Sequence, residues 1–268
     1  MCTNGYIMES DEEARRLDLK TDPATIEKHA SWAGLKTGMR VADLGCGSGK
    51  TTFHLNKLTG ATGETIGIDK SEQRIEFAEM HYTGKSIKFE LADIRSDLTS
   101  YGKFDFIWVR FVLEYYGTTA FDIIQNISQV LKPGGIMCLI DLDYNCLTHY
   151  GLPERLESAI VGLRRTVEQK ADFDPFAGRK LYSYLYDMEY VDLDVRVEAH
   201  HLIFGELSEV DKFNWTKKVE VGAKLSGYTF DEYDGGYDEF YEDFRKGFSH
   251  PRRFTYTPVI VCRGKKLS

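Results

Sequence analysis

Residues 41–51, with the sequence Val-Ala-Asp-Leu-Gly-Cys-Gly-Ser-Gly-Lys-Thr, constrain the fold of this chain more than any other stretch. The apolar start is typical of a buried strand, and glycines at every second position, Gly45, Gly47 and Gly49, stop that strand. Because glycine has no Cβ, the backbone there can adopt positive φ and let a ligand approach its amides. The residues from Lys50 onward suit a helix whose free N-terminal amides face the loop. Strand, loop and helix together predict a nucleotide-type binding site.

The spacing of the loop leaves three interpretations open. A phosphate-binding P-loop needs a glycine four residues before Gly-Lys-Ser/Thr, and Leu44 stands at that position. A dinucleotide fingerprint, Gly-x-Gly-x-x-Gly, has Lys50 where its third glycine should be. The third interpretation rests on Asp43, a carboxylate directly before the loop, which would repel a pyrophosphate but attract a ligand that carries an ammonium group.

Residues 43–49, Asp-Leu-Gly-Cys-Gly-Ser-Gly, resemble the first motif of the class I S-adenosylmethionine-dependent methyltransferases, acidic-x-Gly-x-Gly-x-Gly. The resemblance covers about residues 30–145 well and the remainder poorly. It implies S-adenosylmethionine as cofactor, S-adenosylhomocysteine as product, and a methionyl moiety held, directly or through water, by Asp43 and the loop residues Gly45, Cys46, Gly47 and Gly49.

Two further carboxylates follow at the ends of predicted strands. Asp69 lies 20 residues beyond Gly49, where a carboxylate can accept both ribose hydroxyls of a nucleoside, with Lys70 lining the adenosine edge; the alternative is an acidic cap for the helix that begins near Ser71. Asp93 and Ile94 resemble the next motif of the family. This implies that Asp93 accepts from the adenine amino group while Ile94 packs on the ring, the alternative being an exposed loop carboxylate.

The periodicity predicts an α/β fold, a Rossmann-like doubly wound sheet of seven strands whose last strand is antiparallel, with a helical lid insertion. We expect strands at residues 40–44, 65–68, 87–91, 104–109, 136–140, 191–204 and 257–262. We expect helices at residues 23–32, from 50, 71–82, 119–131, 156–169, 178–188 and 208–225. The turn Lys132-Pro-Gly-Gly before the fifth strand also resembles the family and is structural.

The predicted organisation is an N-terminal helical arm at 1–34, a Rossmann-like cofactor-binding core at 35–204, an inserted helical and aromatic lid at 205–255, and a final core strand and tail at 256–268. In the arm, Arg15 or Arg16 either meets the cofactor carboxylate or belongs to a solvated segment. Within the lid, Phe240, Phe244 and Phe248 fall at helical spacing and predict an amphipathic helix with its rings inward. The alternative is an aromatic acceptor pocket with acids at its mouth, suited to an amine or a flat aromatic substrate.

Methyl transfer needs few catalytic side chains, because the sulfonium already makes the methyl group electrophilic and the protein mainly aligns a nucleophile. Arg110, at the end of the fourth strand, is a candidate for the cofactor pocket. The candidate bases are Glu114, His149, His200, His201 and a lid tyrosine, with no single assignment. Arg110 and Glu114, four residues apart, can alternatively pair on a helix face. A metal would want carboxylates near Asp141 and Asp143, and we expect no metal.

The amino-acid composition and net charge limit the kinds of partner that we expect for this protein. The net charge is −8, from 34 basic and 42 acidic residues, with a pI near 5.5, which argues against a nucleic-acid partner. Five scattered cysteines without metal spacing fit a reducing compartment. The sequence shows no leader and no apolar run of about 18 residues, so we expect a soluble cytoplasmic protein that does not associate with a membrane. We expect a monomer or a homodimer.

These features predict an S-adenosylmethionine-dependent methyltransferase that O- or N-methylates a small-molecule acceptor by in-line transfer. Two alternatives stay open: an NAD-linked oxidoreductase that uses Asp69 for ribose, and a non-catalytic relative that binds the cofactor.

Overall fold

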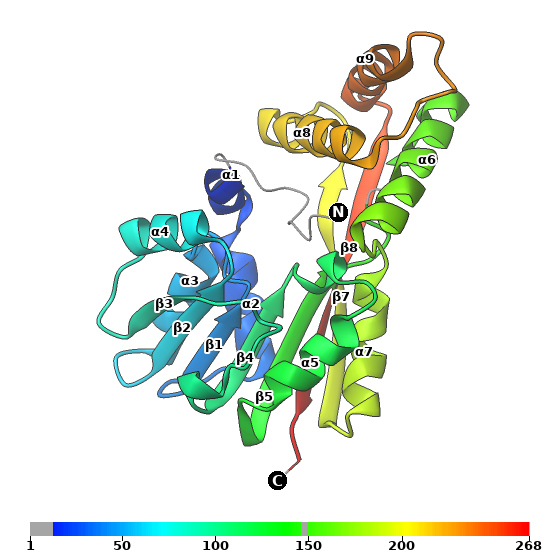
Figure 1. The fold of residues 1–268 in the computed structure, drawn as a ribbon. Helices are drawn as coiled ribbons and strands as arrows, with labels where there is room; N and C mark the ends of the chain where they lie inside the picture. Colours follow the sequence, from blue (N-terminus) through cyan, green and yellow to red (C-terminus); the bar gives the residue numbers. More distant parts are fainter. Residues whose placement is uncertain (1–12, 146–148, 268) are drawn as a thin grey trace.

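The computed structural model describes residues 13–145 and 149–267. Residues 1–12 of the predicted N-terminal arm and residue 268 of the predicted tail lie outside this part of the chain. The described residues form an α/β fold built on one mixed sheet (Figure 1). None of the helices in this part of the chain combines the length and apolar character that crossing a bilayer requires.

The sheet has the order β3-β2-β1-β4-β5-β8-β6, and β7 also pairs with β8. Strands β1 to β5 are parallel and β8 runs antiparallel to β5, as the sequence predicted. The described part of the chain adds an eighth strand, the two-residue β6, to the seven that were expected. The bounds are β1 Arg40–Leu44, β2 Glu64–Asp69, β3 Ile87–Leu91, β4 Phe104–Arg110, β5 Leu131–Leu142, β6 His149–Tyr150, β7 Val191–Ile203 and β8 Phe254–Lys265.

Helices cover both faces of the sheet. The helix bounds are α1 Glu13–Lys20, α2 Pro23–Ala33, α3 Lys50–Thr59, α4 Glu72–His81, α5 Ala120–Ser128, α6 Glu154–Ala171, α7 Ala177–Asp187, α8 Glu209–Ser226 and α9 Gly236–Ser249. Along β4, Ile107 and Val109 pack with α5 and α7, whereas Phe106 and Trp108 pack with α2 and α3. Successive strand residues point to opposite faces, so this near-continuous apolar run builds two cores.

Local signals set several boundaries. Asp22 caps α2 through hydrogen bonds from the amides of Ala24 and Thr25, and Gly34 ends it at φ 103°. The helix expected at 119–131 ends earlier, at Ser128, because Leu131 already pairs with Phe104. The predicted Lys-Pro-Gly-Gly turn lies inside β5 as a bulge, since the register shifts before the next pair, Phe106 with Ile136.

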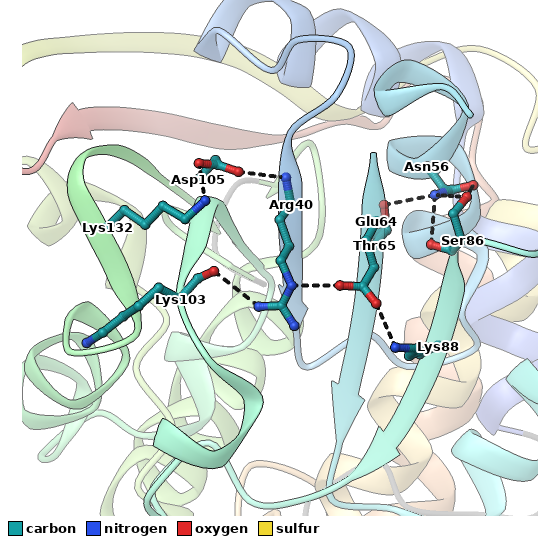
Figure 2. A network of polar contacts seen from close by, with 9 residues as sticks. All are labelled: Arg40, Asn56, Glu64, Thr65, Ser86, Lys88, Lys103, Asp105 and Lys132. Atoms are coloured by element: carbon teal, nitrogen blue, oxygen red, sulfur yellow. Dashed lines mark hydrogen bonds and ion pairs between the residues drawn. The ribbon is translucent and has the colours of Figure 1, made fainter. Parts of the chain in front are cut away.

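Charged residues join the amino ends of the strands, at the edge opposite the glycine loop (Figure 2). Asp105 accepts from the Arg40 amide at 2.9 Å and from Lys132 Nζ at 2.6 Å. Glu64 pairs with Arg40 Nε at 2.6 Å and with Lys88 Nζ at 2.7 Å. These partly exposed pairs fix the register of β1 to β5 and leave the carboxyl ends free to build a site.

Strands β7 and β8 run on past the rest of the sheet and carry a helical layer. Residues 259–265 of β8 pair with β5, while its first residues pair with β6. Helices α6, α8 and α9 lie together beside this extension (Figure 1). The rings of Phe240, Phe244 and Phe248 are fully buried there, which confirms the prediction of an amphipathic helix with its aromatic face inward. Helix α6 packs into this layer although it falls within the range 35–204, and the division into core and lid stays a prediction.

Replacing Phe244 by alanine should destabilise the protein by about 3 to 5 kcal/mol, because the ring is 0% exposed and its loss leaves a cavity among α6, α8 and α9. Urea unfolding followed by circular dichroism measures the change. Phe204→Ala, at a ring that is 64% exposed, is the control and should change stability by no more than about 0.5 kcal/mol. Equal effects of the two substitutions would contradict the helical layer described here.

Candidate functional site

The glycine loop has a conformation that only glycine supports at its three key positions. Gly45, Gly47 and Gly49 have φ of 78°, 56° and 83°. A Cβ on Gly45 would lie 2.4 Å from Val112 Cγ2, and one on Gly49 would lie 2.6 Å from Ala78 Cβ. The loop is therefore packed against neighbouring elements as well as bent.

Hydrogen bonds within the protein already engage the loop amides. The amides of Gly45 and Cys46 donate to the Ile68 carbonyl at 2.7 and 3.1 Å, and the Gly49 amide donates to the Cys46 carbonyl at 3.1 Å. A P-loop needs these donors for phosphate oxygens. The geometry therefore argues against a phosphate-binding P-loop. A ligand without phosphates could still pack against the surface of this loop.

Asp69 ties the loop to the end of β2. Its carboxylate is 4% exposed and accepts from the Gly47 amide at 2.9 Å, from the Ser71 amide at 3.0 Å and from Arg74 Nη1 at 3.4 Å. Ser71 is the N-cap residue of α4, so Asp69 also supports the start of that helix, as its alternative role predicted. A carboxylate with about four acceptor sites keeps capacity for a ligand hydroxyl.

Asp93 and Ile94 follow β3 and line the same cavity as Asp69. Arg95 binds Asp93 through both side-chain oxygens, with Nε to Oδ1 at 3.0 Å and Nη2 to Oδ2 at 2.5 Å. This hydrogen bonding lowers the pKa of Asp93. A ligand amino group must share these oxygens with Arg95, a partner that the sequence reasoning missed although it lies only two residues away. Ile94 is buried and offers an apolar surface.

Asp43 lies behind the cavity rather than in its wall. The carboxyl group is buried, accepts from Thr52 Oγ1 at 2.7 Å, and has its pKa raised to about 7 by burial. Arg110 lines the cavity and carries the opposing charge; burial lowers its pKa to about 10 against the attraction of Asp43. Direct contact between Asp43 and a ligand in the cavity is not part of this geometry.

One cavity of about 890 Å³ brings these elements together. Helix α1, the glycine loop, the ends of β2 to β4, the last turn of α6, β7 and α8 all contribute to its wall. Of the residues selected from sequence, the lining includes Gly45, Cys46, Gly47, Asp69, Lys70, Asp93, Ile94, Arg110, Glu114, His200 and His201, with Arg16 from the arm. Asp43, Gly49 and His149 are not in the lining, and neither is any lid residue from 227 to 255.

Glu114 is a buried carboxyl group at the cavity floor. It lies in the 3-10 turn η2, Leu113–Tyr115, so the alternative of a helix-face pair with Arg110 is wrong. Its Oε2 accepts from Asn145 Nδ2 at 2.6 Å, while Asn145 Oδ1 accepts from Lys218 Nζ at 2.7 Å. Burial raises the pKa of Glu114.

The three candidate histidines are poor bases. Burial, and after it the nearby cations Lys20 or Lys218, lower the pKa values of His149, His200 and His201. His149 Nδ1 lies 2.8 Å from Thr255 Oγ1, away from the cavity. All three imidazoles are neutral at pH 7, and Glu114, whose pKa burial shifts upward, is the better candidate base.

The two carboxylates considered for a metal have other partners. Asp143 pairs with Arg179, and Asp141 accepts from the Glu114 amide at 3.1 Å. Within residues 13–145 and 149–267, no group of three or more potential ligand side chains has the geometry of a metal site.

Sequence reasoning missed wall residues that come from distant helices. They are Lys20 of α1, Arg74 of α4, and Trp215 and Lys218 of α8. Helix α1 reaches the site because Lys50 Nζ and the Tyr82 hydroxyl both donate to Asp18. Only the long-range packing of α1 and α8 places these side chains at the cavity, and no local pattern signals it.

The residues present fit an adenosyl amino acid. A Cβ at Gly47 would lie 3.2 Å from Leu17 Cδ1, so a side chain there would make a tight contact with α1. Asp69, Ile94, Arg110 and Arg16 line one cavity, so it holds acceptors for hydroxyl groups, an apolar surface and cations for a carboxylate. These groups are compatible with S-adenosylmethionine, and the role of each residue stays a prediction.

The fold and site define a class of protein, and comparison with known proteins agrees. Residues 35–188 match the family model described as a methyltransferase domain, and the chain belongs to this family. The predicted membership in the class I S-adenosylmethionine-dependent methyltransferases, with S-adenosylmethionine as cofactor, is confirmed at the level of the family.

Two curated relatives illustrate the similarity. The chain is 29% identical over 135 residues to a demethylmenaquinone methyltransferase of Staphylococcus aureus, with 47% of this chain and 56% of the relative covered. It is 31% identical over 118 residues to the enzyme of the same name from Lactococcus lactis, with 42% of this chain and 46% of the relative covered. The chain therefore matches about half the length of these relatives.

Solved structures share the fold at low identity. A Bacillus halodurans protein described as a methyltransferase has a TM-score of 0.58 at 13% identity, with 91% of this chain and 100% of that chain covered. The phosphoethanolamine N-methyltransferase 2 of Haemonchus contortus, solved with S-adenosylhomocysteine, has a TM-score of 0.57 at 13% identity, with 97% of this chain and 58% of that chain covered. These matches confirm the Rossmann-like fold.

Asp69→Ala should weaken the binding of S-adenosylhomocysteine at least about tenfold, because it removes a carboxylate that holds both the loop and a ligand hydroxyl. Isothermal titration calorimetry measures the change. Glu72→Ala, at an exposed carboxylate on α4, is the matched control and should leave the affinity within about twofold. Unchanged affinity in folded Asp69→Ala would remove Asp69 from the cofactor site.

Proposed function

We propose that this chain is a methyltransferase that moves a methyl group from S-adenosylmethionine to an oxygen or nitrogen of a small-molecule acceptor. The observation that carries the proposal is the single cavity in which the glycine loop and Asp69 face Glu114 and α8. A cofactor binding site and space for a second molecule lie in one enclosure. The family match and the names of the relatives support the same reaction.

Alignment of the acceptor is the main task of the protein in this reaction. When bound, S-adenosylmethionine supplies a methyl group on a sulfonium, which is already electrophilic. The loop and Asp69 orient the cofactor end, and residues of α1 and α8 line the same cavity. Holding the two molecules in line and excluding water accounts for most of the rate gain such a site can provide.

Glu114 is the group that we assign to proton removal. As the acceptor atom forms its bond to carbon and the sulfonium becomes a thioether, the acceptor gives up a proton, and a nearby carboxylate can take it. Glu114 lines the cavity, and burial raises its pKa toward the working range of a base. The hydrogen bond from Asn145 keeps one carboxylate oxygen in place.

An aromatic portion in the acceptor fits the cavity wall, where one ring, Trp215, lies within the range 205–255 predicted for the lid and the others come from the segment after β4. The lid rings at 228–248 pack into the helical layer or face away from the cavity. The cavity is lined instead by Phe111, Tyr115, Tyr116 and Trp215. These rings support a flat or apolar acceptor, in agreement with the aromatic half of the sequence expectation.

The proposed function is tested in two steps. S-adenosylhomocysteine is titrated into the protein, and methyl transfer from labelled S-adenosylmethionine is then measured on a panel of phenols, aromatic acids and amines. Binding with transfer supports the proposal, and binding without any transfer supports the non-catalytic alternative. An absence of binding would end the proposal, and NADH oxidation would point to the oxidoreductase.

Glu114→Gln should lower kcat by about 10² to 10⁴-fold on the acceptor that the panel identifies, with S-adenosylhomocysteine affinity within about twofold. Because the pKa of Glu114 is raised, the wild-type kcat falls as the pH drops through that pKa, and the substitution should remove this acidic limb. Glu157→Gln, at an exposed carboxylate of α6, should change neither. An unaltered pH profile in Glu114→Gln would exclude Glu114 as the base.

A further inference from the structure

The charged groups of the cavity differ in their partners. The carboxylates near the glycine loop each have a cationic neighbour: Asp69 binds Arg74, Asp93 binds Arg95, and Asp43 faces Arg110. Lys20 of α1 and Lys218 of α8 also line the cavity. Within residues 13–145 and 149–267, neither of these two ammonium groups forms an ion pair with a carboxylate.

Lys218 is held in a fixed position. Its Nζ donates to Asn145 Oδ1 at 2.7 Å and lies 5.2 Å from the centre of the Trp215 ring. Asn145 is buried and also binds Glu114, so it cannot move without breaking that contact. An ammonium has three donors, and one neutral amide oxygen leaves donor capacity for a ligand in the cavity.

The positive charges of Lys20 and Lys218 repel each other. Burial, followed by the like charge of Lys218, lowers the pKa of Lys20 to about 7. The other charges that face Lys20 are Arg16, Glu114 and Arg110, and the neutral His200 and His201 lie beside it. Three carboxylates also line the cavity: Glu114 faces both lysines, Glu168 pairs with Arg164, and Asp172 accepts from Thr118. The nearby cations Lys20, Lys218, Arg16 and Arg110 thus outnumber Glu114, and an anionic ligand would offset their mutual repulsion.

We propose that Lys20 and Lys218 form a subsite for an anionic group, a carboxylate or a phosphate, on the acceptor molecule. The inference rests on the proposed function and names the substrate class of the same site. With Trp215 beside Lys218, the subsite favours an acceptor in which the anionic group is attached to a flat ring. It disfavours a protonated amine, because two ammonium groups would repel it.

Binding of simple probes tests the subsite. Benzoate, phenyl phosphate, benzyl alcohol and benzylamine are titrated into the full chain, with and without saturating S-adenosylhomocysteine. We expect benzoate or phenyl phosphate to bind at least about tenfold more tightly than benzyl alcohol, and benzylamine to bind most weakly. The two anions distinguish a carboxylate acceptor from a phosphate acceptor. No preference for either anion over benzyl alcohol would overturn the subsite.

Lys218→Met should abolish the preference for the anion, with S-adenosylhomocysteine affinity unchanged within about twofold. Lys217→Met is the matched control, because the neighbouring ammonium lies outside the cavity wall and pairs with Glu220 at 3.4 Å. Preserved anion binding in Lys218→Met would contradict the subsite. A parallel loss of S-adenosylhomocysteine affinity would also contradict it, since Lys218 would then serve the cofactor carboxylate.

The affinity for the anion should also depend on pH. Since the pKa of Lys20 is about 7, its positive charge is lost as the pH rises from 6 to 9, and anion binding should weaken over that range. Lys20→Met should flatten this dependence, and a wild-type affinity that is constant over this range would contradict the role of Lys20. Failure of wild-type protein to bind S-adenosylhomocysteine would reject the proposed function separately, whatever the anions do.

Discussion

The hydrogen bond from the Gly47 amide to the Asp69 carboxylate is the interaction on which the site depends. It joins the loop after β1 to the end of β2, and the two amides before it bind the Ile68 carbonyl on the same strand. The parallel register of β1 and β2 makes these bonds reachable, and the charged pairs at the opposite edge help to fix that register. Because the amides of Gly45, Cys46, Gly47 and Gly49 donate within the protein, the loop can keep a rigid shape without a phosphate ligand.

The length of β7 and β8 decides what faces the loop. Had these strands ended with the rest of the sheet, α6 and α8 would have no support above its carboxyl edge. Their extension carries the aromatic layer of Phe240, Phe244 and Phe248, and this layer in turn holds α8, with Trp215 and Lys218, against the cavity. The rings that were expected to form an acceptor pocket therefore do not line the cavity. They support α8, and α8 lines the cavity.

Local signals predicted most of the fold. The third strand was expected at residues 87–91 and lies at Ile87–Leu91, and the second helix begins at Pro23 behind Asp22, because alternation, capping and glycine act within a few residues. The same reasoning placed Asp69, Ile94 and Glu114 at the cavity. The role of Asp43, which is buried against Thr52 behind the wall, stays a prediction, and the reasoning missed Lys20 and Lys218, which lie almost 200 residues apart in the sequence. Contacts between residues so far apart in the sequence depend on tertiary packing and produce no periodic pattern in the sequence.

Burial also sets the protonation states that give the cavity its chemistry. The same removal from water raises the pKa of Glu114 and lowers those of His200 and His201, since each group is pushed toward its neutral form. Histidine is the residue that most often acts as a base near pH 7, but here burial keeps His200 and His201 neutral and they serve only as lining. The Glu114 carboxyl group instead gains proton affinity, as a base requires. The positive charges of Lys218 and Lys20 limit how far burial can raise the pKa of Glu114, because a nearby cation favours the ionised form. The balance between burial and these cations thus decides which side chain in this cavity can accept a proton.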